Sequence, residues 1–501
     1  MNRNNAHFFI LLLTALSFSA CSGVKMPGGG GGTGSISVMM VADTLPPHPS
    51  LLSLQVTITG ITLTTSSNIQ NSATLSAPIT VDLMRLQSDT AFLGTFLKIP
   101  AASYKSATLA FSSPAEITFL NDTASTLSGC APNTVCTLAS NTAAGTPIAN
   151  VTFAVIDKGL TGIGIDLNLN NAVSITGTTL AVNLSNNNVI SAFTLPRQGS
   201  NLSAGQFGLI EDFTGVVSLT GNSVTITSPT RGTLTAAATA TTVFDSDPAN
   251  TLCPSGTSTL SGCVSLNQVA SVDAVLNADG TLSIQEIEPL LSTRQDIVEG
   301  IVTSINSTNL TQFGIIVTDK PSTAASNSLI GGLNIGNLLT VNIPAPNPFL
   351  VDTKGLPMNT VSPGSLSFFA NQTNTAAIHL GQTVALHVTS FTPAAGTTPA
   401  SSVAATVILR WSRFTATPVS STLTLLNVTG LPTYFNFAPA TQLVTDLFPG
   451  TPGTKGVTNF DGIVDGTGVS SLKPVSLRAL FLENPGNTAN PALFAASIRQ
   501  R

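Results

Sequence analysis

Apolar and polar residues alternate with a period of two along most of the chain after residue 34, and no other sequence feature constrains the fold as strongly. In a clear example, Ile163, Ile165, Leu167 and Leu169 alternate with small or polar residues. Such alternation is typical of a β-strand with one buried face. Roughly eight such segments, separated by polar turns, follow one another over about 160 residues, which favours a β-sandwich.

One of these segments changes parity. Leu54, Val56 and Ile58 share one parity, whereas Ile61 has the other. Simple alternation would expose one set to water, and burying each Leu or Ile is worth roughly 1.5–3 kcal/mol. We therefore expect a β-bulge at Thr59-Gly60, with the glycine at a positive φ.

The chain after residue 205 repeats loosely. Strand openings at Phe213–Ser218 and Val298–Ser304 are each followed by a polar turn and a second strand. Asp279-Gly280 marks a hairpin turn later in the first repeat, and the strands at 383–388 and 403–410 are its counterparts in the second. A spacing of about 80–115 residues indicates duplicated domains rather than a solenoid.

The fold class we predict is all-β, with an N-terminal β-sandwich followed by two or three smaller antiparallel β-barrel-like domains. The expected boundaries are a sandwich at 35–196, a first repeat at 205–295, a second at 296–411 and a degenerate third unit at 412–501, with a linker at 196–205.

The first 21 residues have the order of a secretory signal: Arg3, an apolar run from Phe8 to Leu16, and small residues before Cys21. Ser19-Ala20-Cys21 resembles the lipobox of bacterial lipoproteins, in which the cysteine is acylated with palmitate-type chains. We predict a lipoprotein signal peptide at 1–20, lipidation of Cys21 and a Gly-rich tether at 21–34. An ordinary secretory signal with an incidental cysteine is the alternative. The resemblance implies a membrane-anchored lipoprotein of the cell envelope, and Ser22 implies the outer membrane if the source is Gram-negative.

Charged residues make up only 8% of the chain, and the formal net charge is −5. Without a run of Lys and Arg, the sequence lacks the basic footprint that nucleic acid requires. For the same reason we expect no electrostatic docking on anionic lipid, so that membrane attachment would depend on the acyl chains.

Once Cys21 is set aside, four cysteines remain in two local pairs, Cys130/Cys136 and Cys253/Cys263. An exported protein meets an oxidising compartment, so we predict a disulfide within each pair. A metal site is disfavoured because neither pair has CxxC spacing.

Two pairs of side chains are candidates for chemistry. Glu286 and Glu288 have strand spacing and therefore share a face, as a glycoside hydrolase requires of its carboxylates, although a solvated face is the simpler interpretation. His379 and His387 flank Gly381-Gln382, and a hairpin there would place them on neighbouring strands. Two histidines without nearby cysteine or carboxylate make a poor metal site.

Three further features are weaker. Asp245 and Asp247, and Asp461 and Asp465, invite a calcium interpretation, but turn chemistry explains both pairs. Trp411 ends a predicted strand, where it would be exposed and could stack on a sugar. We assign no catalytic residue, no metal ligand and no cofactor.

The function expected is that of a lipid-anchored cell-envelope protein with a structural or binding role, such as adhesion. Its partners would be the membrane, through the acyl chains, and an envelope polysaccharide or protein. An envelope polysaccharide hydrolase and a component of a surface assembly are the alternatives; an exposed β-edge would indicate the latter.

Four stretches between residues 81 and 166 resemble the DUF4382 family of envelope lipoproteins, a domain of unknown function. They are Val81–Gln87, Ile99–Tyr104, Ala107–Leu109 and Ile163–Asp166. The similarity covers about residues 35–190. The repeats after residue 205 weakly resemble a second uncharacterised family, DUF5666. These resemblances imply a fold and a location but bring no catalytic residues.

Overall fold

The computed structural model describes residues 31–500 except for several segments within that range. Those left out are 48–49, 74, 76–77, 141–143, 196–205, 229–230, 245–252, 255, 291–295, 321–328, 345–348, 352–377, 432–442, 452–455 and 482–492. The predicted signal peptide, Cys21, the 196–205 linker, Asp245 and Asp247 therefore lie outside the described residues.

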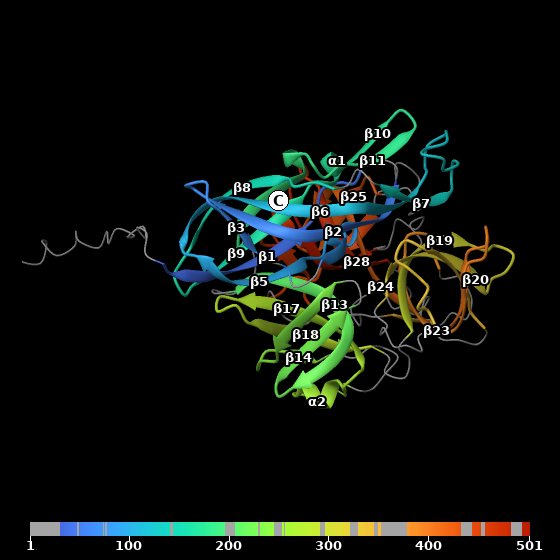
Figure 1. The fold of residues 1–501 in the computed structure, drawn as a ribbon. Coiled ribbons are helices and arrows are strands. Elements are labelled where there is room, and N and C mark those ends of the chain that lie inside the picture. Colours follow the sequence, from blue (N-terminus) through green and yellow to red (C-terminus); the bar gives the residue numbers. More distant parts are fainter. Residues whose placement is uncertain are drawn as a thin grey trace, which may run out of the picture.

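The predicted all-β fold class is confirmed, since strands form nearly all the regular structure of the described residues (Figure 1). The helical parts are single turns, such as η1 (Arg85–Gln87), α1 (Leu169–Ala172) and α2 (Leu260–Cys263). Within the part of the chain that is described, no helix is long and apolar enough to cross a membrane.

The N-terminal part is a sandwich of two sheets. The first sheet has the order β12-β9-β1-β5, and the second has β3-β2-β6-β7 with β4 beside β2 and β8 beside β6. Their bounds are β1 Thr33–Val41, β2 Ser50–Thr65, β3 Gln70–Ala73, β4 Ile79–Asp82, β5 Ala91–Pro100, β6 Ala102–Leu120, β7 Val135–Ser140, β8 Ile148–Val155, β9 Leu160–Leu167 and β12 Ile190–Thr194. A hairpin of β10 (Val173–Thr176) and β11 (Thr179–Val182) extends from this part. The alternating apolar faces, including Ile163, Ile165 and Leu167, form one continuous core between the sheets.

The predicted bulge is confirmed, but the predicted conformation of Gly60 is wrong. Ile58 pairs with Phe111 and Gly60 with Ala110, so Thr59 is the extra residue. Apolar side chains on both sides of the bulge are buried. Gly60 is absent from the residues with positive φ, and a Cβ there would meet only the Ala110 Cβ at 3.8 Å. The exposed Thr59 takes up the irregularity, so the glycine keeps an ordinary strand conformation.

Three repeat units with the same strand-pairing scheme follow the sandwich. In each, strands one, two and three pair antiparallel in succession, strand one also pairs with five, and five pairs with six. Strand three then pairs parallel with strand six, which closes the sheet on itself, and the short strand four also pairs with six. The second and third units repeat every one of these pairings.

The strands of the units share one chain order. The first unit contains β13 Gln206–Thr220, β14 Ser223–Ser228, β15 Gly232–Ala237, β16 Val243–Phe244, β17 Val269–Asn277 and β18 Leu282–Pro289. The second contains β19 Ile297–Ile305, β20 Gln312–Asp319, β21 Leu338–Asn342, β22 Phe349–Val351, β23 Thr383–Thr392 and the first half of β24 Ala400–Ser421. The third contains the second half of β24, β25 Leu425–Thr429, β26 Leu443–Asp446, β27 Asn459–Asp461, β28 Val475–Phe481 and β29 Leu493–Arg499.

Strand β24 belongs to two units at once. Its first half pairs with β23, and its second half pairs with β28 and β25. The boundary expected between residues 411 and 412 therefore falls inside a continuous strand. In Figure 1 the first unit (green) lies below the sandwich, the second (yellow) lies to its right, and the third (red) lies behind it.

The cysteines join in the two local pairs that the sequence predicts. The Cys130–Cys136 disulfide connects the turn before β7 to that strand, and the Cys253–Cys263 disulfide lies at α2 in the core of the first unit. Strand β1 begins at Thr33, so the first strand starts within the segment expected to be tether.

Gly215 and Gly300 lie within the first strand of the first two units and have no room for a side chain. A Cβ at Gly215 would lie 2.3 Å from the Thr227 carbonyl oxygen, and a Cβ at Gly300 would lie 2.3 Å from that of Ile316. In both units the obstacle is the backbone of the neighbouring strand, which cannot move without breaking the ladder. The Gly-Val and Gly-Ile pairs that mark the repeat in the sequence thus mark a close approach of two strands.

We predict that Gly215→Ala and Gly300→Ala each lower the free energy of unfolding by roughly 1–3 kcal/mol, because the strands must separate to admit a methyl group. Gly60→Ala is the matched control and should cause no loss, since the methyl group has room and the backbone is compatible with alanine. Denaturant titration followed by circular dichroism measures all three. Equal losses in Gly60→Ala and Gly215→Ala would contradict this explanation.

Candidate functional site

The central strands of the repeat units are buried on both faces. On β17, Ala270 and Val272 point into the core of the first unit, whereas Ser271 and Asp273 point outward and are buried as well. On β28 every residue is buried, with Arg478 on the outward face. The outward faces are covered because the three units and the sandwich pack against one another. We call this common contact region the junction.

Every arginine that the structure describes lies in the junction with its side chain buried. Seven buried carboxylates surround these arginines, and together they form what we call the arginine cluster. Its arginines are Arg85, Arg231, Arg410, Arg413, Arg478 and Arg499. Its carboxylates are Asp89, Glu211, Asp212, Asp273, Glu288, Glu299 and Asp319.

Arg85 links the sandwich to the first two repeat units. Its Nη1 lies 2.9 Å from a carboxylate oxygen of Asp319 and 3.3 Å from one of Glu299, and its Nε lies 3.3 Å from Asp89. Its Nη2 donates to the carbonyl of Asp212 at 3.4 Å. Burial alone would lower the pKa of Arg85, but these carboxylates raise it above its ordinary value, so the group stays charged.

A second set of contacts surrounds Asp89 in the sandwich. Arg231 of the first unit places Nη2 3.0 Å from the Asp89 carboxylate and stacks on the ring of Phe213 at 5.0 Å. Arg499 of the third unit donates to the Asp89 carbonyl at 3.2 Å and to the Thr90 hydroxyl at 3.0 Å. The segment after η1 therefore contacts two different repeat units.

Asp212 holds the first unit in the cluster with its backbone as well as its side chain. It lies where the β13–β17 register shifts, and its φ is 49°. Its N–H donates to Asp273 at 2.7 Å, and its carbonyl accepts from Arg85 and Arg231. Aspartate tolerates this left-handed conformation better than most residues, and such conformations persist only where surrounding contacts enforce them.

The Asp212 carboxylate binds the third unit. It contacts Arg413, lies 2.8 Å from Nη2 of Arg478, and accepts from the Ser271 hydroxyl at 3.3 Å. Arg478 also lies over the ring of Trp411 at 5.3 Å. Trp411 is only 1% exposed, so the expectation of an exposed, sugar-stacking tryptophan is wrong. The strand continues past residue 411 into the third unit, which covers the ring.

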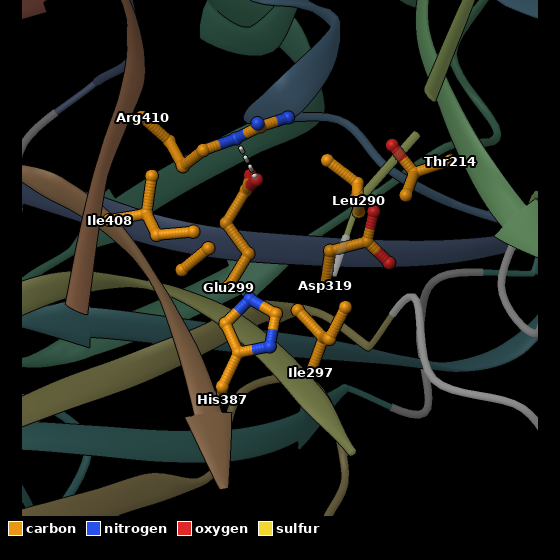
Figure 2. Close-up of a pocket in the computed structure, with 9 residues that line it drawn as sticks. Thr214, Leu290, Ile297, Glu299, Asp319, His387, Ile408 and Arg410 are labelled. Carbon is orange, nitrogen blue, oxygen red and sulfur yellow. Dashed lines mark ion pairs between the residues drawn. The ribbon is translucent and has the colours of Figure 1, made fainter. Parts of the chain in front are cut away.

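Three small cavities border the cluster. Figure 2 shows the one between the first two units, where Glu299, Asp319, His387 and Arg410 point toward a common space. This cavity is about 10 Å³, and the two others near Arg85 are about 20 and 30 Å³. A single water molecule needs about 10–15 Å³, so these cavities have the size for one or two water molecules and are too small for a sugar.

The two candidate carboxylates lie in different surroundings. Glu288 is fully buried, with Nη1 of Arg410 3.8 Å from its carboxylate. Glu286 is half-buried and stands opposite Asp273 in the β17–β18 ladder. Glu288 thus belongs to the arginine cluster, and no observation here favours the hydrolase alternative.

The expectation that the two histidines stand on neighbouring strands is wrong, because His379 lies outside any strand. His379 precedes β23 and packs near Phe481, with ring centroids 6.1 Å apart, whereas His387 lies within β23 and is buried. Gly381 has a φ of 88° in the turn that leads into β23. Among the described residues, no three His, Cys, Asp or Glu side chains are placed to bind a metal ion.

The acidic turn at the end of the chain is occupied by protein contacts. Asp461 pairs with Arg499 at 3.1 Å, and Asp465 accepts from the backbone N–H of Thr467 at 2.8 Å as the cap of η5 (Gly466–Gly468). Turn chemistry and an ion pair account for both residues.

The arginine cluster is not among the sites predicted from the sequence. One signal was present: Arg410, Arg413 and Arg478 each stand among large apolar residues of a strand, as in Val407–Phe414. A charged residue on the outward side of such a strand indicates that another layer covers it, because charged groups are rarely buried without partners.

One family model matches part of the sandwich. Residues 33–182 match the family described as "Domain of unknown function (DUF4382)". The match runs from the first residue of β1 to the last of β11, which is less than a third of the chain. No curated protein matches the sequence.

We predict that Asp212→Asn lowers the free energy of unfolding by roughly 3–5 kcal/mol, because Arg413 and Arg478 lose a buried partner while the left-handed backbone remains acceptable. Trp411 is the only tryptophan, so its fluorescence in a denaturant titration reports directly on the junction. Asp279→Asn, at the exposed β17–β18 turn, is the control and should change stability by less than about 0.5 kcal/mol. Similar losses of stability in the two variants would contradict a particular contribution of the arginine cluster.

Glu211 makes stability depend on pH. Burial raises its pKa from 4.5 to about 7, against the lowering effect of Arg478. Between pH 4.5 and 7 the folded state therefore binds more protons than the unfolded state, so the free energy of unfolding falls as pH rises through this window. We expect a decrease of roughly 1–3 kcal/mol from this group.

Glu211→Gln should remove that part of the decrease, because the amide resembles the protonated carboxyl. Glu116→Gln, on the exposed side of β6, is the control and should leave the pH dependence as in the parent protein. Denaturant midpoints at about pH 5, 6, 7 and 8 measure the effect. The assignment would be contradicted if the free energy of unfolding of the wild-type protein rose with pH and that of Glu211→Gln rose less.

Proposed function

We propose that this protein is a lipid-anchored cell-envelope protein with a structural or binding role. The observation that carries the proposal is Ser19-Ala20-Cys21, which follows a short apolar run and precedes a Gly-rich segment. A lipobox cysteine would be acylated and become the first residue of the mature chain. The envelope membrane, outer if the source is Gram-negative, is the proposed location.

The distance between Cys21 and the first strand supports this proposal. Thr33 lies twelve positions after Cys21. A flexible segment of that length has a mean reach of roughly 20 Å and a limit of about 40 Å. An anchor at Cys21 would therefore keep the β-units close to the membrane surface.

The junction favours a structural or binding role. Buried ion pairs hold the sandwich and the repeat units in one arrangement, and the cavities beside them have the size of water molecules. A protein with these properties presents surfaces to a partner, and an envelope polysaccharide or another envelope protein is the proposed class. The likeness of the repeats to DUF5666 remains a prediction.

Lipidation is tested by labelling cells with radioactive palmitate and separating membranes from soluble protein. The test variant combines Cys21→Ser with a conventional cleavable secretory signal in place of residues 1–20, so that the uncut apolar run cannot itself hold the protein. We expect this variant to be unlabelled and soluble. Ser19→Gly, which keeps a small residue before the cysteine, should be labelled and stay with membranes.

An unlabelled parent protein would refute the lipid anchor. So would a soluble-signal variant that still sediments with membranes although it carries no label. Capture of partners from detergent-solubilised envelope, together with glycan-array binding, then identifies the partner class.

A further inference from the structure

We propose that the end of the sandwich where the tether joins β1 rests on the membrane and binds anionic phospholipid headgroups. This inference rests on the proposed lipid anchor and adds a second contact to it. The sequence contains no run of basic residues, and on that ground no electrostatic docking on lipid is expected. The fold, however, gathers separated lysines at one place.

Four segments meet at this end, which we call the tether face. The Ala101 N–H donates to the Gly32 carbonyl, and the Lys158 N–H donates to that of Thr33, so the β5–β6 and β8–β9 turns flank the start of β1. The Ser66 N–H donates to the Ser103 carbonyl, which brings in the β2–β3 turn. Figure 1 shows β1, β3, β8 and β9 reaching the left end of the sandwich together.

Three of the four exposed lysines in the described part of the chain lie on the tether face. They are Lys98 at the end of β5, Lys105 near the start of β6 and Lys158 in the β8–β9 turn. The fourth, Lys473, is in the third unit. Since every described arginine is buried in the junction, the tether face carries most of the exposed positive charge of the described residues.

Two carboxylates border these lysines. Asp157 accepts from the Thr33 N–H at 3.0 Å, and Asp279 of the β17–β18 turn accepts from the Thr281 N–H at 3.0 Å. Gly280 in that turn approaches Leu160 and Thr95 of the sandwich. The face thus keeps an excess of positive charge in a protein whose net charge is −5.

Large apolar side chains are exposed among the lysines. Leu97 is 69% exposed, Ile156 66% and Ile69 61%, and each lies within one or two residues of a segment just described. Lysines beside exposed leucine and isoleucine match a membrane interface, where the charge meets headgroups and the apolar side chain enters the acyl boundary.

The tether selects the membrane as the occupant. Thr33 lies in the middle of this face, twelve positions after Cys21. A flexible chain of that length would reach roughly 20 Å, so an acylated Cys21 would hold the face against the bilayer. A basic residue near an anionic bilayer strengthens binding about fivefold, and such charge acts within a Debye length. A contact of this kind adds electrostatic binding to that of the acyl chains, and it orients the protein on the bilayer.

The test uses the unlipidated chain 22–501, which contains every described strand, so that binding cannot come from the acyl chains. It is mixed with sedimentable vesicles of phosphatidylcholine alone or of phosphatidylcholine and phosphatidylglycerol at about 7:3. We expect binding to the anionic vesicles only, weakened at about 0.5 M salt. The combined variant Lys98→Glu, Lys105→Glu, Lys158→Glu should lose binding at least tenfold.

The matched control is Leu472→Ser with Lys473→Glu, an exposed Leu-Lys pair in the third unit, which should bind within twofold of the parent. The triple Lys→Gln variant should show a smaller loss than the Glu variant, and Trp411 fluorescence verifies that all variants are folded.

Equal binding to both vesicle types, no binding by the parent, or equal losses in the control would each overturn the inference. Palmitate labelling of Cys21 is measured separately. If Cys21 is labelled but the chain does not bind vesicles, only the lipid-binding role of the tether face is refuted. If the chain binds vesicles but Cys21 is not labelled, only the lipid anchor is refuted.

Discussion

The arrangement of the four β-units depends on the ion pairs around Asp212. Its left-handed backbone directs the carbonyl to Arg85 of the sandwich and Arg231 of the first unit, while its carboxylate contacts Arg413 and Arg478 of the third. Replacing a buried ion pair by apolar side chains is often neutral for stability, whereas removing one partner is costly. The cluster therefore fixes which faces meet more than it adds to the total stability.

The two kinds of basic residue are separated in space, and their chemistry explains why. A guanidinium offers five donors in a plane and stays charged when buried, so one arginine such as Arg85 satisfies several carboxylates from different units. An ammonium is a strongly hydrated point charge that loses more on burial. Four of the five lysines that the structure describes are accordingly exposed, and three of these share the tether face. A chain with few charges thus has a polar, largely uncharged surface with one basic end.

Local features could be predicted from the sequence, and features that depend on distant partners could not. The alternation of apolar and polar residues predicted the strands, and the change of parity predicted the bulge before Gly60. Asp279-Gly280 predicted the β17–β18 turn. Each of these features depends on a few adjacent residues. Trp411 was misjudged because its surroundings are set by β28, more than sixty residues later. The cluster joins Asp89 to Arg499, and no period or motif records a contact over that separation. The backbone of Asp212 shows the same limit: it has a positive φ at the β13–β17 register shift, where arginines from other units contact it.

Because ion pairs form much of the junction, they also fix the orientation of the repeat units relative to the sandwich. Apolar sheet faces can slide past one another with little penalty, because burial depends on area rather than on direction. Ion pairs between Arg85 and Asp319, and between Arg231 and Asp89, are satisfied at one relative position only. The repeat units therefore project from the sandwich at a fixed orientation. If the tether face lies on the membrane, the same surfaces of the repeat units always face away from it, so that a partner in the envelope meets them without a further ordering step.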